Sequence, residues 1–225
     1  MPKVTLIVVN YNARDLIINC LRALEKQLFK HFEVVIIDNG SSDDSLGQIE
    51  GFFERNQLAH SIKLIAFKKN LGFAGSNLEE LKHSNAEYIA LLNSDTEPRK
   101  EWLGELVKAM DNDLNVGICA SKLIVNVTDI IDSAGDGFPT ALRGFKRGEG
   151  GKTSSYNRNE FIFGACAGAA LYRRKRVDEI GFLDEDFFLI HEDTDLNFRA
   201  QLVPTTPQIC LICSGRVHRL VKILK

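Results

Sequence analysis

The most constraining feature of this chain is a regular alternation, between residues 4 and 92, of short apolar runs with longer runs of helical periodicity. Short apolar runs bounded by polar residues are typical of buried strands, and apolar residues at helical spacing indicate amphipathic helices. The predicted strands are Val4–Val9, Val34–Ile37, Ile62–Phe67 and Tyr88–Leu92, and the predicted helices are Leu16–Leu28, Leu46–Phe53 and Phe73–Leu81. Strands and helices in this order form a parallel sheet with helices on its faces, so we predict an α/β fold.

A polar or glycine-containing segment follows each predicted strand. The four segments are Asn10–Asn12, Asp38–Asp43, Asn70–Gly75 and Asn93–Asp95. Because open α/β sheets bind ligands at the carboxyl ends of their strands, we expect these segments to line one crevice. Asp38 can accept a hydrogen bond from a base or a ribose there, although a turn that caps the next helix explains the same residues. Asn70–Gly75 has small residues at a helix start, as phosphate-binding loops do, but it matches neither the Walker nor the dinucleotide motif.

Two acidic segments far apart in the sequence are the candidate reactive groups. Asp95 emerges at the carboxyl end of a predicted strand, where it can bind a divalent cation together with phosphate oxygens. His191–Asp195 opens an amphipathic helix shortly after the acidic and aromatic run Asp184–Phe188. Burial and mutual repulsion can raise the pKa of one such carboxyl group toward the range of a general base. The alternatives are a helix cap at Asp95 and an ordinary acidic helix start at His191–Asp195.

Composition and charge exclude several classes of protein. The net charge of -2 and the pI near 6.2 show no basic excess, so we expect no nucleic acid as a partner. No apolar run approaches the roughly 20 residues that span a bilayer, and the start at Met1 lacks a signal sequence, which predicts a cytoplasmic protein. The odd number of cysteines, mostly within apolar runs, predicts buried thiols rather than disulfides. These residues are Cys20, Cys119, Cys166, Cys210 and Cys213.

The second half of the chain has less periodicity. A predicted helix at Trp102–Met110 and an apolar run at Val116–Val125 precede a polar, glycine-rich stretch, Asn126–Glu160, which we predict to be a long mobile insertion beside the acceptor. Its candidate ligand contacts are Asp132, Gly135, Arg143, Lys146 and Arg147. The tail Arg216–Lys225 alternates basic and apolar residues, which predicts either peripheral contact with anionic lipid or a terminal helix with a solvated basic face.

Taken together, the motifs resemble family 2 glycosyltransferases, and most closely the rhamnosyltransferase-like branch. The resemblance covers residues 3–201 and rests on Val8–Asn12, Val35–Ser41, Asn70–Ala74, Leu91–Thr96, Gly168–Arg174, Gly181–Phe188 and Glu192–Leu196. It implies a GT-A (nucleotide-diphospho-sugar transferase) fold, with a Rossmann-like, mostly parallel sheet flanked by helices. It also implies a single domain over residues 1–225, with a nucleotide-sugar-binding half at 1–98 and an acceptor and catalytic half at 99–225.

The resemblance also implies a reaction and its residues. A sugar, with rhamnose as one candidate, would pass with inversion from a UDP- or dTDP-sugar to a saccharide or lipid-linked glycan, at the inner face of the membrane where the acceptor is lipid-linked. Asp193 matches the catalytic aspartate that deprotonates the acceptor hydroxyl, and Glu192 would orient the acceptor. Asp95 would bind Mg²⁺ or Mn²⁺ on the diphosphate, with His218 as the counterpart of a metal-ligating histidine. The implied nucleotide-sugar-binding residues are Asn10, Tyr11, Asn12, Asp38, Asn39, Ser41, Asn70, Gly72, Phe73, Asn77, Asn93, Ser94 and Asp95.

The sequence departs from the family pattern at two places. Asn93 stands where the family's D-x-D motif has its first aspartate. After Gln201 the segment Leu202–Pro207 intervenes before the stretch that contains His218. The second departure leaves open a nucleotide-sugar-binding remnant without transferase activity. A nucleotidyltransferase, which also combines a metal with a parallel sheet, is a further alternative.

Overall fold

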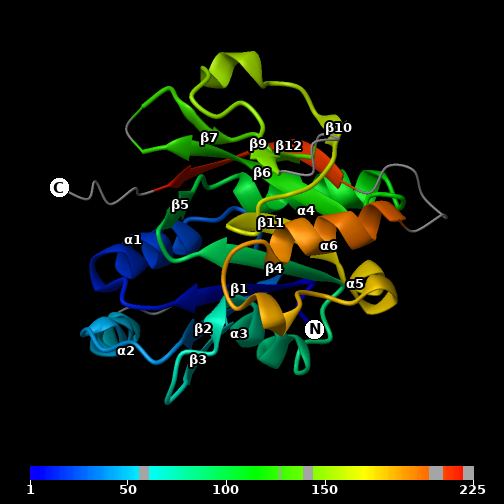
Figure 1. Cartoon of the computed structure of the whole chain (residues 1–225). Coiled ribbons are helices and arrows are strands. Elements are labelled where there is room, and N and C mark those ends of the chain that lie inside the picture. The colour runs from blue at the N-terminus through cyan, green and yellow to red at the C-terminus, as the bar shows by residue number, and fades with distance from the viewer. Residues whose placement is uncertain (56–60, 127, 139–143, 203–209, 220–225) are drawn as a thin grey trace.

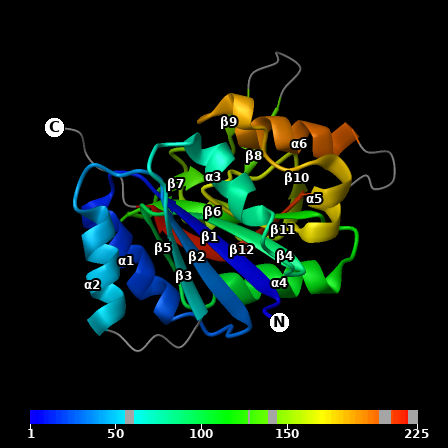
Figure 2. The same cartoon turned by 90° about the horizontal axis from the view of Figure 1, so that it is seen from below.

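The structure is a computed structural model that describes residues 1–55, 61–126, 128–138, 144–202 and 210–219, and in 210–216 the backbone alone. In this part of the chain, ten strands join in one mixed sheet with helices on both faces (Figures 1 and 2). The strand order is β10-β12-β6-β11-β4-β1-β2-β3, with β5 paired to β12 and β7 paired to β6. No helix among the described residues is long and apolar enough to cross a membrane.

The first half of the chain forms the parallel part of this sheet. Its strands are β1 (Val4–Asn10), β2 (Phe32–Asp38), β3 (Ser61–Ala66) and β4 (Tyr88–Asn93). Its helices are α1 (Arg14–Glu25), α2 (Ser45–Arg55) and α3 (Gly72–Leu81). The register pairs Asn10 with Asp38 and Val9 with Asn93, so the strands end side by side. The predicted α/β order of residues 4–92 is therefore confirmed.

The second half extends the sheet with strands of both directions. Its main elements are β5 (Thr96–Pro98), α4 (Trp102–Asn112), β6 (Ile118–Val125), β10 (Glu160–Ile162), β11 (Ala169–Arg173) and β12 (Cys210–Arg219). β11 lies antiparallel between β4 and β6 and pairs Ala169 with Leu92. Because of this direction, the segment before β11 meets the carboxyl end of β4, which brings residues 165–168 beside Asn93.

Two apolar layers pack the helices onto the sheet. Leu6 and Val8 face one layer with α1, α2 and α4, whereas Ile7 faces the other layer with α3, α5 (Arg174–Ile180) and α6 (Glu192–Leu202). Figure 2 shows the two groups of helices on opposite sides of the strands. The alternation along β1 follows from the two-residue period of strand side chains. A sheet buried on both faces explains why the parallel strands read as continuous apolar runs.

The insertion Asn126–Glu160 contains regular structure in its described parts, although its sequence has little periodicity. It contains β7 (Ile131–Ser133), β8 (Asp136–Gly137), β9 (Phe145–Lys146) and a 3₁₀ turn, η1 (Thr153–Ser155). The buried Lys122 ammonium holds the turn by donating to the carbonyl oxygens of Thr153, at 3.3 Å, and Tyr156, at 2.6 Å. Arg143 lies outside the described residues.

Two predictions are corrected. Residues 216–219 form the end of β12 rather than a helix, because all four pair with β6 and the last three also pair with β5, and residues 220–225 lie outside the described part. Cys20 and Cys166 are free thiols, as predicted, but Cys119 is disulfide-bonded. The side chains of Cys210 and Cys213 lie outside the described part.

Candidate active site

A pocket of about 390 Å³ opens at the carboxyl ends of β1, β2 and β4. Most of the residues predicted to bind a nucleotide sugar line it, together with apolar side chains. The lining consists of Val9, Tyr11, Ala13, Leu16, Asn39, Asn70, Gly72, Phe73, Asn93, Ser94, Asp95, Phe188 and Leu189. The strand register produces this arrangement, because it places the polar segments after β1, β2 and β4 at one edge of the sheet.

Asn10, Asp38 and Ser41 form a hydrogen-bonded group at this edge. Asn10 Nδ2 donates to Asp38 Oδ1 at 3.1 Å, and the Ser41 backbone N–H donates to Asp38 Oδ2 at 3.1 Å. The Ser41 hydroxyl oxygen in turn accepts from the Asn12 N–H at 3.0 Å. These bonds fix the Asp38 carboxylate, as a turn requires. Asn10 Oδ1 is buried without a hydrogen-bond partner among the described residues, so it can accept a bond from a ligand.

Asn39 and Asn70 shape the turn that enters α3. Asn39 Nδ2 donates to Asn70 Oδ1 at 2.8 Å, while Asn39 Oδ1 accepts from the Leu71 N–H at 2.9 Å. Asn70 Oδ1 also accepts from the Gly72 N–H at 2.8 Å. Gly72 has φ of +76°, a left-handed conformation that favours glycine. Asn77 lies further along α3, where its Nδ2 donates to the Phe73 carbonyl oxygen at 2.8 Å.

The segment before α6 lines the pocket and caps the first turn of α3. The Phe188 carbonyl oxygen accepts from the N–H groups of Phe73, at 2.7 Å, and Ala74, at 3.4 Å. Phe188, Ile190 and His191 all have positive φ, at 51°, 80° and 74°. We name residues 187–191 the strap. Its large apolar side chains are exposed. This contact could not be predicted from the sequence, because a backbone carbonyl that caps another helix has no side-chain signature.

Asp193 lies at the start of α6 and contacts a short segment that also contacts Asn93. Its Oδ2 accepts from the Ala167 N–H at 3.2 Å, and the Gly168 carbonyl oxygen accepts from the Asn93 N–H at 2.9 Å. Asn197, one turn further along α6, holds the Ala165 backbone with two hydrogen bonds of 3.0 and 3.1 Å. The two acidic segments, about a hundred residues apart in the sequence, are thus joined through residues 165–168.

Two further carboxyl groups near Asp193 have raised pKa values. Glu192 is buried, which together with the charge of Asp193 raises its pKa, and its Oε2 has no partner among the described residues. Asp136, whose backbone bonds to that of Gly164, has its pKa raised to about 7 by burial and by the charge of Asp193. Sequence analysis did not single out Asp136. Its place in a glycine-rich stretch gave no sign that it would lie near Asp193.

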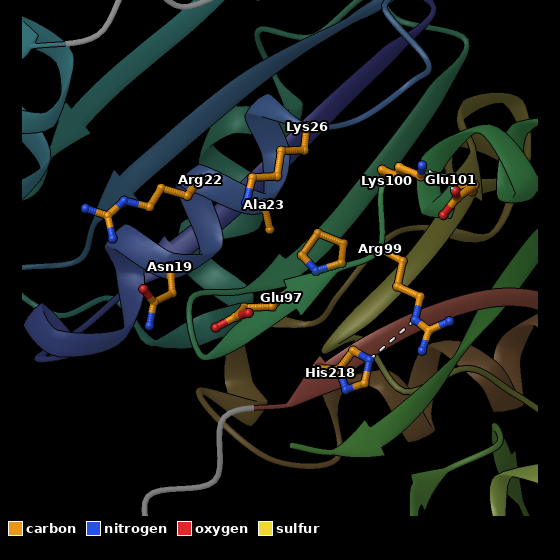
Figure 3. A pocket seen from close by; sticks show the side chains of 10 residues that line it. Asn19, Arg22, Ala23, Lys26, Glu97, Arg99, Lys100, Glu101 and His218 are labelled. Atoms are coloured by element: carbon orange, nitrogen blue, oxygen red, sulfur yellow. Dashed lines mark hydrogen bonds and ion pairs between the residues drawn. The ribbon is translucent and has the colours of Figure 1, made fainter. Parts of the chain in front are cut away.

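Asp95 belongs to a charged network rather than to a pair with His218. Arg219 Nε donates to Asp95 Oδ2 at 3.3 Å, and Arg219 Nη1 donates to Asp132 Oδ2 at 3.2 Å. His218 lines a different pocket, of about 650 Å³, where its Nε2 accepts from Arg99 Nε at 3.4 Å (Figure 3). Neighbouring side chains of a strand point to opposite faces, so Arg219 and not His218 reaches Asp95.

A sequence comparison decides the family. The model of glycosyl transferase family 2 matches residues 5–181. The chain belongs to glycosyl transferase family 2. Relatives in this family include an uncharacterized glycosyltransferase of Haemophilus influenzae, 29% identical over 126 residues that cover 56% of this chain and 38% of the relative. The putative teichuronic acid biosynthesis glycosyltransferase TuaG of Bacillus subtilis is 31% identical over 112 residues, which cover 48% of this chain and 42% of TuaG. The matches thus span less than half the length of these relatives.

Solved structures establish the GT-A fold predicted from the family 2 resemblance. Staphylococcus aureus TarS 1-349 in complex with UDP-GlcNAc superposes with a TM-score of 0.69 at 22% identity, covering 99% of this chain and 60% of TarS. The mannosyltransferase PcManGT of Pyrobaculum calidifontis, in complex with GDP-Man and Mn²⁺, gives 0.69 at 19% identity and covers 99% and 58%. The relatives are varied family 2 glycosyltransferases, so the rhamnosyltransferase-like branch stays a prediction.

One carboxylate oxygen of this family 2 site is suited to bind a divalent cation. Asp95 Oδ1 is buried and has no hydrogen-bond partner among the described residues, so it could serve as a ligand of the cation. Within the same residues, no group of three or more His, Cys, Asp or Glu side chains is arranged to hold a metal. A single carboxylate is sufficient for a Mg²⁺-like ion whose other ligands are phosphate oxygens and water. The residues therefore fit a cation that arrives with a diphosphate.

Proposed function

We propose that the chain is an inverting glycosyltransferase that moves a sugar from a nucleotide-diphospho-sugar to a hydroxyl of a saccharide or a lipid-linked glycan. The observation that supports it is the contact of residues 165–168 with both Asn93 and Asp193. This contact supports a single site that combines the donor pocket with a carboxylate suited to deprotonate an acceptor. Membership of glycosyl transferase family 2 supports the same reaction.

Asp193 is the general base of the proposed reaction. Its carboxylate is half-buried at the first turn of α6 and fixed by the Ala167 N–H, and the Thr194 hydroxyl donates to its other oxygen at 3.3 Å. A fixed carboxylate can take the proton of the acceptor hydroxyl while that oxygen attacks the anomeric carbon. Glu192 orients the acceptor in this proposal, because its buried Oε2 has no hydrogen-bond partner among the described residues and can accept from a hydroxyl group.

The donor occupies the pocket at the strand ends. In this proposal Asn10, Asn12 and Asp38 hold the base and ribose, and Asn70, Gly72 and Asn77 lie beside the sugar nucleotide. The other proposed nucleotide-sugar-binding residues of these segments are Tyr11, Asn39, Ser41 and Phe73. Asn93, Ser94 and Asp95 lie beside the diphosphate, with Asp95 as a ligand of Mg²⁺ or Mn²⁺. The cation supplies positive charge to the departing nucleoside diphosphate. Mn²⁺ in the PcManGT complex supports a divalent cation for this fold.

The donor itself is proposed to be a UDP- or dTDP-sugar, with rhamnose as one candidate. TarS in complex with UDP-GlcNAc supports a uridine nucleotide, whereas PcManGT in complex with GDP-Man makes guanosine the main competitor. A thermal-shift screen of UDP-, dTDP- and GDP-sugars, each with and without Mn²⁺, tests this point. We expect one nucleotide to give the largest shift, and a larger shift with Mn²⁺.

Transfer by the purified chain completes the test. The donor found in the screen is incubated with a panel of saccharide and lipid-linked acceptors, and released nucleoside diphosphate and glycosylated product are measured together. Product with inverted anomeric configuration supports the proposal. Donor binding without transfer or hydrolysis would favour a nucleotide-sugar-binding remnant, and release of pyrophosphate from a nucleoside triphosphate would favour a nucleotidyltransferase.

A further inference from the structure

Arg219 joins two carboxylates that come from distant parts of the chain. Its guanidinium donates to Asp95, which follows β4, and to Asp132 in β7, at 3.3 and 3.2 Å. The backbone of Arg219 is held on both sides, because it pairs with Thr96 of β5 and Val125 of β6. A strand end clamped between two others fixes the Cα position. The guanidinium is therefore held beside the carboxylate that is proposed to bind the cation of the diphosphate.

The local charges explain why a cation is needed there. Among the described residues, Asp95, Asp132, Asp136 and Asp193 contribute carboxyl groups to this region, and the cations Lys146 and Arg219 pair with some of them. Lys146 is engaged with Asp132 at 2.9 Å. A donor diphosphate would add negative charge to a region that already has more carboxylates than cations, which opposes binding unless positive groups face it.

Arg219 has the donor atoms to meet that charge. A guanidinium has five N–H donors in a planar fork, and such forks bind phosphate oxygens in bidentate fashion. Among the described residues, two of these donors serve the two carboxylates. The side chain is 29% exposed, so its remaining donors are accessible to a ligand, and its partner Asp95 lines the donor pocket.

We infer that Arg219 is a diphosphate-binding residue of the donor site, an inference that rests on the proposed glycosyl transfer. During transfer the bond from the anomeric carbon to the diphosphate oxygen breaks, and its electron pair stays on that oxygen. The acceptor oxygen forms the new bond to carbon, and its proton passes to Asp193. Arg219 binds the diphosphate as it gains this charge, and Asp95 and Asp132 hold the guanidinium in place before the donor arrives.

The test measures binding of inorganic pyrophosphate, because this probe does not depend on the nucleotide base. Calorimetry with and without Mn²⁺ compares the wild-type chain with Arg219→Met and Arg219→Lys. Arg219→Met keeps the aliphatic length and loses the charge, and we expect a loss of affinity of at least about tenfold under both conditions. Arg219→Lys keeps the charge without the fork, so it should give an intermediate affinity. It also serves as the test should the methionine variant fail to fold.

A matched control separates a local effect from a general loss of positive charge. Arg99 lies beside His218 in the other pocket (Figure 3), whose lining does not include Asp95, so Arg99→Met should bind pyrophosphate like the wild type. Unchanged affinity in Arg219→Met, equal losses in both methionine variants, or no pyrophosphate binding by the wild type would each overturn the inference. Failure of the proposed function is a separate result, in which pyrophosphate binds through Arg219 but no nucleotide sugar is bound or transferred.

Discussion

The proposed transfer reaction requires the negative charge of the Asp193 carboxylate, whereas the stability of the fold depends little on this charge. Asp193→Asn preserves the size of the side chain and can still accept from the Ala167 N–H. We therefore expect donor affinity within about twofold of wild type and transfer reduced by roughly 10²- to 10⁴-fold, the usual contribution of a general base. Steady-state kinetics and calorimetry with the same donor measure the two effects.

Asp195→Asn is the matched control for this prediction. Asp195 lies two residues further along α6, where its carboxylate pairs with Arg199 at 2.7 Å. An ion pair of this kind contributes about 0.3–0.5 kcal/mol to a helix, so the control should keep nearly full transfer. Equal turnover in Asp193→Asn and wild type would remove Asp193 as the base.

Asp136 gives the protein a pH-dependent stability with a defined sign. Its pKa is raised from 3.8 to about 7, so the folded state prefers the protonated form. The stability that this group contributes is complete below the unfolded pKa near 4 and is lost as the pH rises through 7. Asp193, Lys146 and Asp132 are the charged groups that act on it, and burial is the largest cause.

Asp136→Asn should abolish this dependence, because the amide does not ionise. We expect the wild type to lose at least about 4 °C of Tm relative to Asp136→Asn between pH 5 and pH 8, the equivalent of about 1–2 kcal/mol for a chain of this length. Differential scanning calorimetry at both pH values measures it. Asp178→Asn, which alters an exposed ion pair with Arg174, is the control, and parallel Tm changes in all three proteins would contradict the prediction.

At the scale of elements, the strap contacts α3 at the start of the helix. Replacing each of two glycines of this helix by alanine should therefore change the free energy of unfolding in opposite directions. Gly72 has φ of +76°, and a Cβ there would clash with the Phe188 carbonyl oxygen. Gly75 is helical, and its Cβ would make an ordinary 3.5 Å contact with Leu71. Gly72→Ala should lower the free energy of unfolding by at least about 1–2 kcal/mol, whereas Gly75→Ala should raise it by about 0.5–1 kcal/mol.

Urea denaturation measures both variants, and donor affinity adds a functional reading. Because Phe188 also lines the donor pocket, the shift forced by Gly72→Ala should weaken donor binding, and Gly75→Ala should leave it unchanged. Similar stability and donor affinity in the two variants would contradict the prediction, because they would show that the strap can leave the start of α3 without cost.

The elements of the first half could be predicted from sequence because each one is local. The strand predicted at Tyr88–Leu92 spans Tyr88–Asn93 in the structure, and the helix predicted at Phe73–Leu81 spans Gly72–Leu81. The antiparallel place of β11 could not be predicted, since strand pairing across distant segments leaves no periodic signal. His218 and Arg219 show the limit most clearly, because a shift of one residue along a strand exchanges the face that a side chain occupies.

At the scale of the whole molecule, the pairing of β4 with β11 joins the two predicted halves, 1–98 and 99–225, in one sheet. The proposed active site draws Asn10 and Asp95 from one half and Asp193 and Arg219 from the other. A ligand that binds both halves only when they are folded together should stabilise the entire chain. We therefore expect calorimetry to show one unfolding transition that moves as a unit when donor and Mn²⁺ are added.

The size of that shift follows from mass action. At a donor concentration of 100 Kd the stabilisation is about 2.7 kcal/mol, which corresponds to roughly 5–10 °C in Tm for a chain of 150–250 residues. Asp95→Asn should reduce the part of the shift that depends on Mn²⁺, because it removes the carboxylate proposed to bind the cation. The corresponding nucleoside, which lacks the diphosphate, should give a smaller shift that is the same with and without Mn²⁺. Two separate transitions, with only one moved by the donor, would mean that the halves unfold independently and that the donor site belongs to one of them.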